Sequence, residues 1–368
     1  DAERRVLNNL RFISEKDVFL KNILLNELEM SQRKTVLSTK IRSFTITLTN
    51  RCNLGCLACE ARRYQWEMPK ETAEEIMGYL PYLEYIMWQG GEAFLVDYFK
   101  DLLEETKHFL HIKQTIVTNG MLLSEDLIAN LMQLPDIVLT ISVDGVTKDV
   151  YEDIRRGAKF DKLIKNLEII NSMRKHYNSG MRLHLNVTIM KSNYHQLLGF
   201  IDFAKEYGFG QILFRPVQGN FNNEENIFYH RDKVALNLIN KMMGEIYMKA
   251  QKYQITLDNR IPALEVPHSN TPYTHKDGRQ TNNSGLLCYA PWQRLYISWG
   301  GNVYPDCMCF WPQDAGIGNV MRESIREIWN NAGMQLYRKK IIENNYMDLC
   351  SKDCISGNVP KRYLAFNK

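Results

Sequence analysis

Residues 44–60 read FTITLTNRCNLGCLACE, and this stretch decides the fold class of the chain. In its first six residues Phe, Ile and Leu alternate with Thr, which predicts a β-strand. Three cysteines follow at Cys52, Cys56 and Cys59, in the spacing C-x3-C-x2-C. The cysteines are therefore predicted to lie in a loop at the C-terminal end of a strand.

The three clustered thiols favour an iron–sulfur cluster over a zinc site or free thiols. Structural zinc takes four ligands, and the nearest histidine that follows these cysteines is His108. A cubane cluster normally takes four cysteines, so three leave one iron open to a small molecule. The motif therefore predicts a catalytic rather than a structural cluster.

The strand at 44–49 is the first of a series. Further strands are predicted at 84–89, 113–118, 137–143, 182–190 and 211–217, with helical periodicity between them. Six βα units imply a parallel sheet, either doubly wound or closed into a complete or partial barrel. All of these folds place ligands at the C-terminal ends of the strands, where the cysteines lie.

The remaining segments divide the chain into four parts. Residues 1–40 are predicted to form an N-terminal helical segment, 41–255 the core with a last helix over about 232–253, and 256–286 a linker or lid. In the last part, 287–368, a hairpin over 294–304 and helices over about 322–345 are expected. This part holds Cys288, Cys307, Cys309, Cys350 and Cys354.

Composition excludes several classes of protein. With 45% hydrophobic and 24% charged residues the chain is neither disordered nor collagen-like. A net charge of +4 without a run of like charges argues against a nucleic-acid partner or a polybasic membrane anchor. No apolar stretch is long enough to span a bilayer and no signal peptide is recognisable, so a soluble cytoplasmic protein is expected.

The motif in this position resembles the radical S-adenosylmethionine (radical SAM) superfamily over residues 42–217. The resemblance implies an α/β fold, a partial (β/α)6 barrel of parallel strands, in which Cys52, Cys56 and Cys59 bind a [4Fe–4S] cluster whose open iron chelates SAM. Reductive cleavage of SAM then yields a 5′-deoxyadenosyl radical that abstracts hydrogen from the substrate. The residue before the third cysteine, usually aromatic in this family, is Ala58 here.

The same resemblance assigns further SAM-binding residues. Gly90, Gly91 and Glu92 at the end of the second strand match the family's GGE motif, in which the carboxylate accepts a hydrogen bond from the SAM ammonium. Ser142 and Arg156 match residues that contact the SAM ribose or carboxylate, and Asn186 matches a recurrent polar position. Asn119 is placed either on the same rim or in a solvent-facing turn.

The C-terminal cysteines resemble the auxiliary-cluster domains called SPASM or, with one cluster, twitch, and imply a small α+β domain after the barrel. By that comparison Cys288, Cys307, Cys350 and Cys354 bind one auxiliary [4Fe–4S] cluster, and zinc is the alternative. Cys309 is left over, as a buried inert thiol, a replacement ligand or a catalytic hydrogen donor.

The function that this resemblance implies is a radical SAM oxidoreductase acting on a peptide or protein side chain by crosslinking, oxidation or epimerisation. The alternatives are a dehydrogenase or epimerase of a sugar or aminocyclitol, and a non-catalytic cysteine-rich zinc module. The expected partners are a peptide or small-molecule substrate and a reductant such as flavodoxin or ferredoxin, with no nucleic acid and no membrane.

Overall fold

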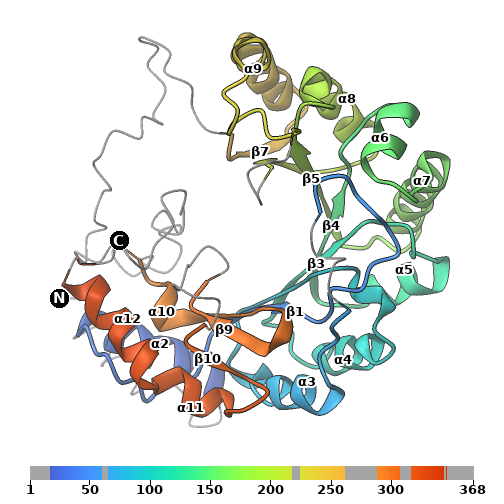
Figure 1. Ribbon diagram of the computed structural model, residues 1–368. Helices are drawn as coiled ribbons and strands as arrows, with labels where there is room; N and C mark the ends of the chain where they lie inside the picture. The colour runs from blue at the N-terminus through green and yellow to red at the C-terminus, as the bar shows by residue number, and fades with distance from the viewer. Residues whose placement is uncertain are drawn as a thin grey trace.

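The computed structural model describes residues 17–59, 65–217, 224–261, 288–306, 316–343 and 345. They form one curved ten-stranded sheet in the order β10-β9-β8-β1-β2-β3-β4-β5-β6-β7 (Figure 1). Strands β1 to β7 are parallel, β8 runs parallel to β1, and β9 and β10 are antiparallel to their neighbours. The bounds are β1 Ser43–Thr47, β2 Tyr85–Gln89, β3 Lys113–Thr118, β4 Asp136–Ser142, β5 Arg182–Ile189, β6 Gln211–Pro216, β7 Thr256–Asn259, β8 Arg294–Ile297, β9 Asn302–Tyr304 and β10 Gly318–Asn319.

The six strands predicted for the core, β1 to β6, and the hairpin β8–β9 are confirmed to within two residues at each end. A seventh parallel strand, β7, pairs with β6 and occupies the first four residues of the expected linker at 256–286. That expectation was wrong for residues 256–259. Of these four residues only Leu257 is apolar, so the strand carries almost none of the alternation that marks a buried strand.

Helices cover the convex side of the sheet and complete the partial barrel (Figure 1). The alternating side chains of the strands explain this layering, because Phe44, Ile116 and Leu139 are fully buried beneath the helices. The helices that follow β1 to β6 are α3 Lys70–Met77, α4 Phe99–Thr106, α5 Glu125–Leu131, α6 Lys148–Ile154, α7 Phe160–His176, α8 Leu197–Glu206 and α9 Lys233–Lys252.

The N-terminal helix α2 (Val18–Ser31) contacts α10 (Ala290–Gln293) of the C-terminal part, whose last described helix is α12 (Ala332–Ile342). The Nε1 atom of Trp292, in α10, donates to the carbonyl of Lys34 at 2.8 Å. Trp329, in α11 (Ile325–Asn330), donates likewise to Thr39. The fully buried Arg338 of α12 donates to the carbonyl of Thr35 at 2.7 Å. The two ends of the described chain therefore stabilise one another.

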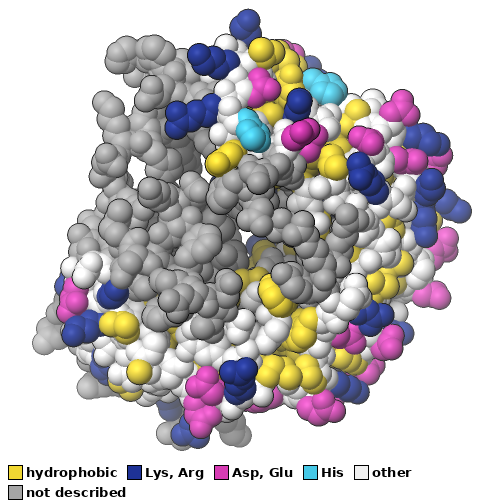
Figure 2. Space-filling model, in the orientation of Figure 1, with side chains coloured by type: hydrophobic (Ala, Val, Ile, Leu, Met, Phe, Trp, Pro, Cys, Tyr) yellow, Lys and Arg dark blue, Asp and Glu magenta, His cyan; other side chains and the backbone are white. Residues whose placement is uncertain are grey.

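Two further features of the described chain are its lack of long apolar helices and the distribution of its surface charge. Within the described ranges, no helix combines the length and the apolar character that crossing a membrane requires. Figure 2 shows basic and acidic side chains interspersed around the visible described surface.

Candidate functional site

The cysteine loop, residues 52–59, is held over the C-terminal ends of the strands by backbone hydrogen bonds to the end of α6. The N–H of Gly55 donates to the carbonyl of Arg156, and the N–H of Leu57 donates to the carbonyl of Ile154, both at 2.8 Å. These bonds bring the loop after β1 to the segment after β4. The sequence placed both segments at this edge, and the structure joins them.

Gly90 and Gly91 bring the end of β2 against the loop. The N–H of Gly91 donates to the carbonyl of Thr49 at 2.7 Å. A Cβ atom at Gly91 would lie 2.1 Å from the carbonyl oxygen of Arg51, and Gly90 has a φ of 132° that side chains rarely adopt. The two glycines therefore let the backbones meet beside Cys52.

Glu92 is completely buried and links the end of β2 to the end of β3. Its two carboxylate oxygens accept hydrogen bonds from the Thr118 hydroxyl at 2.9 Å and the Asn119 N–H at 2.8 Å. Burial raises the pKa of the Glu92 carboxyl, and these hydrogen bonds offset part of that effect. Both oxygens are thus already hydrogen-bonded within the protein. A contact of Glu92 with the SAM ammonium stays a prediction.

Asn119 lies beside the first cysteine. Its Nδ2 atom is 3.7 Å from the Cys52 sulfur and donates to the Oδ1 atom of Asn53 at 2.8 Å. Asn119 is buried, so of the two placements expected for it the structure selects the rim of the site rather than a solvent-facing turn. Asn53 was not singled out from the sequence.

Arg155, rather than the neighbouring Arg156, points at the second cysteine. Its guanidinium lies 3.9 Å from the Cys56 sulfur and forms an ion pair with Asp144 at 2.8 Å. Arg156 is exposed and reaches the loop only through its backbone carbonyl. The sequence offered two adjacent arginines without a signal to choose between them, and Asp144 was also missed.

Ser142 and Asn186 meet on the concave face of the sheet. They are direct partners in the parallel pairing of β4 with β5, and the Nδ2 atom of Asn186 donates to the Ser142 hydroxyl at 3.3 Å. Ser142 is buried and Asn186 is half-buried. The pair brings a hydroxyl and an amide to one spot at the strand ends.

The residues around the loop fit an iron–sulfur cluster. Cys52, Cys56 and Cys59 are free thiols, the first two half-buried and the third exposed. The buried Nε atom of Arg155 has no hydrogen-bond partner among the described residues, while Nη1 of the same guanidinium lies 3.9 Å from the Cys56 sulfur. Burial raises the pKa of the Cys52 and Cys56 thiols, so deprotonation needs a compensating positive charge such as a metal.

No three His, Cys, Asp or Glu side chains in the described part of the chain converge as they would around a single metal ion. A cubane cluster binds each thiolate through a separate iron, so its ligands need not converge in that way. Of the C-terminal cysteines only Cys288 is described. It is buried, and its sulfur accepts a hydrogen bond from the N–H of Ala290 at 3.4 Å. Cys307, Cys309, Cys350 and Cys354 lie outside the described residues.

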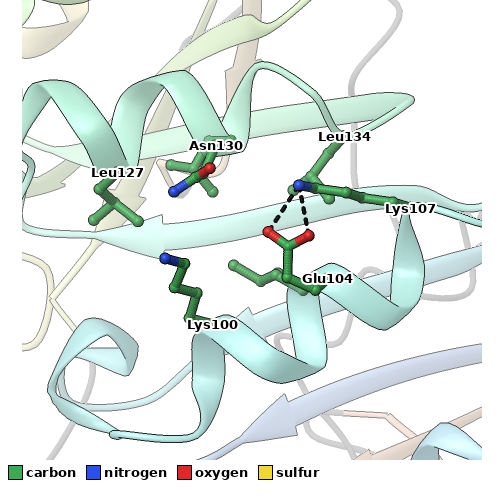
Figure 3. Close-up of a pocket in the computed structure, with 8 residues that line it drawn as sticks. Lys100, Glu104, Lys107, Leu127, Asn130 and Leu134 are labelled. Atoms are coloured by element: carbon green, nitrogen blue, oxygen red, sulfur yellow. Dashed lines mark hydrogen bonds and ion pairs between the residues drawn. The ribbon is translucent and has the colours of Figure 1, made fainter.

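A small cavity between α4 and α5 lies on the convex side, away from this site (Figure 3). Its volume is about 10 Å³, which is room for one water molecule. Lys107 and Glu104 form an ion pair at its edge. The cavity is therefore too small to hold a substrate.

Comparison with known families matches two models to the chain. The radical SAM superfamily matches residues 46–204, and the iron–sulfur cluster-binding SPASM domain matches residues 288–355. The cofactors of these two domains are a SAM-binding [4Fe–4S] cluster with SAM and an auxiliary iron–sulfur cluster. The resemblance inferred from the cysteine motifs is thus confirmed.

Curated relatives differ in their activities. A GTP 3′,8-cyclase of Clostridium botulinum is 26% identical over 223 residues, which are 54% of this chain and 66% of that protein. The chain therefore spans just under two thirds of that relative. An Fe-coproporphyrin III synthase of Methanosarcina barkeri is 24% identical over 352 residues, 84% of this chain and 81% of that protein.

Among solved structures, Streptococcus suis SuiB bound to the precursor peptide SuiA has a similar fold. Its TM-score is 0.61 at 18% identity, and the match covers 86% of this chain and 70% of SuiB. At this identity the match shows the fold alone. It extends over both the partial barrel and C-terminal elements.

Proposed function

The chain belongs to the radical SAM superfamily and carries a SPASM domain, and on this premise we propose that it is a peptide-modifying enzyme. When bound, the cluster and SAM supply a 5′-deoxyadenosyl radical that removes a hydrogen atom from the substrate. The observation that carries the radical chemistry of this proposal is the cysteine loop at the mouth of the barrel, with Gly91, Asn119 and Arg155 around it. We assign residues 41–255, together with β7, to the core and 287–368 to the auxiliary-cluster domain.

Each part of the site is proposed to have one task. Cys52, Cys56 and Cys59 hold the cluster, while Gly90 and Gly91 let the backbone approach SAM closely. Ser142 and Asn186 present polar groups toward the concave face, where they can orient the ribose of SAM. Glu92 keeps the ends of β2 and β3 together beneath this site.

Arg155 is proposed to donate hydrogen bonds to the sulfur of Cys56 and to a neighbouring acceptor on the bound cofactor. Its Nε atom is buried and without a partner in the described chain, so it has a donor to offer. Asp144 holds the guanidinium in place through the 2.8 Å ion pair. Hydrogen bonds and charge near the sulfurs are among the factors that set a cluster's reduction potential.

In the C-terminal part we propose Cys288, Cys307, Cys350 and Cys354 as the auxiliary ligands. Cys309 is then free to act in catalysis as a hydrogen donor. Return of a hydrogen atom from Cys309 to the substrate radical would give epimerisation without net oxidation. In the alternative, the radical would lose an electron to the auxiliary cluster, which would give net oxidation such as a crosslink. A flavodoxin or ferredoxin is the proposed reductant.

A peptide substrate is supported by the fold shared with SuiB, a protein whose structure holds a precursor peptide. The two curated relatives act on other molecules by their names, so the substrate has to be tested directly. The test incubates the anaerobically reconstituted protein with SAM, dithionite and a peptide encoded beside its gene. The 5′-deoxyadenosine formed and the peptide mass are then measured.

A peptide-dependent rise in 5′-deoxyadenosine, with the peptide losing two hydrogen masses or gaining deuterium from D₂O, is the expected result. The matched control replaces Cys52, Cys56 and Cys59 together by alanine, which should lower iron from about eight to about four per chain. Loss of iron without loss of product would contradict the assignment of these cysteines. An unchanged peptide beside a converted GTP or porphyrin would refute the peptide proposal.

A further inference from the structure

A cluster of two arginines and one aspartate lies at the C-terminal ends of β6 and β7, beyond the cysteine loop. Arg215, in β6, forms an ion pair with Asp258 of β7 at 2.9 Å. Arg260, directly after β7, also forms an ion pair with Asp258. Two positive charges thus share one negative charge, and the cluster carries a net charge of +1.

The alternation of side chains along β6 shows that Arg215 faces the concave side of the sheet. Phe214, its neighbour in β6, is fully buried and contacts Phe200 of α8 on the convex side. Successive side chains of a strand point to opposite faces, so Arg215 points the other way. Figure 1 shows α8 outside the sheet at this point.

The cluster therefore lies on the same face of the sheet as Ser142 and Asn186. Ser142 pairs with Asn186 on the next strand, and Arg215 pairs with Thr188, two residues after Asn186 and on the same face. The direct partner of Asn186 in β6 is Leu213, so Arg215 lies one strand spacing of about 4.8 Å across the sheet and two residues along the strand from Asn186.

One hydrogen-bond donor of Arg215 has no acceptor among the described residues. This donor, the Nη1 atom, is shielded from solvent. Nη2 already serves Asp258. A shielded donor without an acceptor is unfavourable, and a ligand that supplies an acceptor at Nη1 would remove this cost.

The charge of the cluster selects the kind of ligand. Burial alone would raise the pKa of Asp258, but the hydrogen bonds and charges of Arg215 and Arg260 outweigh it and hold the pKa below its usual value. Asp258 is thus ionised at neutral pH, and among the described residues of this cluster it is the one carboxylate that faces two guanidinium groups. A carboxylate, with a single negative charge, matches this balance better than a doubly charged phosphate.

We propose that Arg215, with Arg260, binds a carboxylate of the substrate and thereby places the reacting residue beneath the SAM site. The identity of the substrate as a peptide rests on the proposed function. The carboxylate is that of an acidic side chain or of the peptide's C-terminus, and two probes distinguish these sources.

The test uses the full chain, anaerobically reconstituted and supplied with SAM, and measures probe binding by saturation-transfer NMR. N-acetylglutamate α-amide carries a side-chain carboxylate, and N-acetylalanine carries a main-chain one. Their neutral counterparts are N-acetylglutamine amide and N-acetylalanine amide. We expect one acidic probe to bind at least about tenfold more tightly than its neutral counterpart.

Arg215→Met should remove this preference, whereas Arg215→Lys should keep part of it because the charge remains. Asp258 keeps Arg260 as a partner in both variants, and circular dichroism checks that they fold. The matched control is Arg182→Met, because Arg182 forms an ion pair with Asp136 at the N-terminal ends of β5 and β4, whereas Arg215 lies at a C-terminal end. It should bind the probes as the wild type does.

Equal binding of acidic and neutral probes, or an equal effect of Arg182→Met and Arg215→Met, would overturn the proposal. The two proposals fail separately. A peptide converted equally well by the wild type and by Arg215→Met would refute the carboxylate site and leave the peptide function standing. Selective binding of an acidic probe without conversion of any peptide would refute only the peptide function.

Discussion

Replacing Gly91 by alanine is expected to push the end of β2 away from the cysteine loop. The new Cβ atom would lie 2.1 Å from the carbonyl oxygen of Arg51, where real Cβ contacts stay above 3.0 Å. The obstacle is a backbone atom next to Cys52, so no side-chain rotation relieves it. The two segments must separate by about 1 Å.

The loss of stability in Gly91→Ala follows from two backbone hydrogen bonds between the end of β2 and the segment that leads into the cysteine loop. The N–H of Gly91 donates to Thr49 at 2.7 Å and the N–H of Glu92 donates to Arg51 at 2.9 Å. Losing both hydrogen bonds costs about 1–3 kcal/mol, and overpacking adds about 1–3 kcal/mol. The free energy of unfolding should therefore fall by roughly 2–6 kcal/mol.

Urea denaturation followed by circular dichroism measures this change, and iron analysis after anaerobic reconstitution measures the effect on the loop. We expect about four irons per chain to be lost, because Cys52 moves with Arg51. The control is Gly180→Ala, where a Cβ atom meets nothing within 4 Å. If Gly91→Ala matches Gly180→Ala in both stability and iron content, the contact does not position the loop and the reasoning is refuted.

Three further predictions concern single side chains and are checked by urea denaturation. Arg155→Met leaves Asp144 buried without its partner and should lower the free energy of unfolding by about 3–5 kcal/mol. Adding Asp144→Asn to this variant removes the buried charge and should restore part of the lost stability. A further fall in the double variant would contradict the ion-pair account. Burial, with Lys113 and Arg182 nearby, lowers the pKa of His184 to about 4. In the unfolded chain His184 takes up a proton below about pH 6.5, whereas in the folded chain it does so only near pH 4. The free energy of unfolding should therefore fall by about 1–2 kcal/mol between pH 6.5 and 4, after allowance for the partial exposure of the side chain. His184→Gln should flatten this pH dependence. Gly244→Ala, in the exposed middle of α9 with open space around it, should raise stability by about 0.5–1 kcal/mol, and a decrease would show that helix propensity does not govern this site.

The strands of the core were predictable from two patterns, the alternation of buried and half-buried side chains in β5 and the nearly continuous run of buried side chains in β4. Strand β7 was missed because its pairing with β6 depends on backbone hydrogen bonds and on ion pairs rather than on apolar side chains. The association of Arg338 with Thr35 was equally invisible, because about three hundred residues separate the two.

The cysteine spacing by itself determined the cluster chemistry, because iron–sulfur ligation depends on which residues lie close together along the chain. Likewise, the strand–helix alternation determined that the cysteine loop and the GGE segment meet at one edge of a parallel sheet. Only the tertiary structure decided that Arg155 rather than Arg156 faces Cys56, since the chain leaves the helical conformation at Arg155, which caps α6. It also decided that Arg215 lies beyond Asn186 on the concave face. Such choices depend on the register between strands and on how a helix ends, which are set by contacts between residues far apart in the sequence.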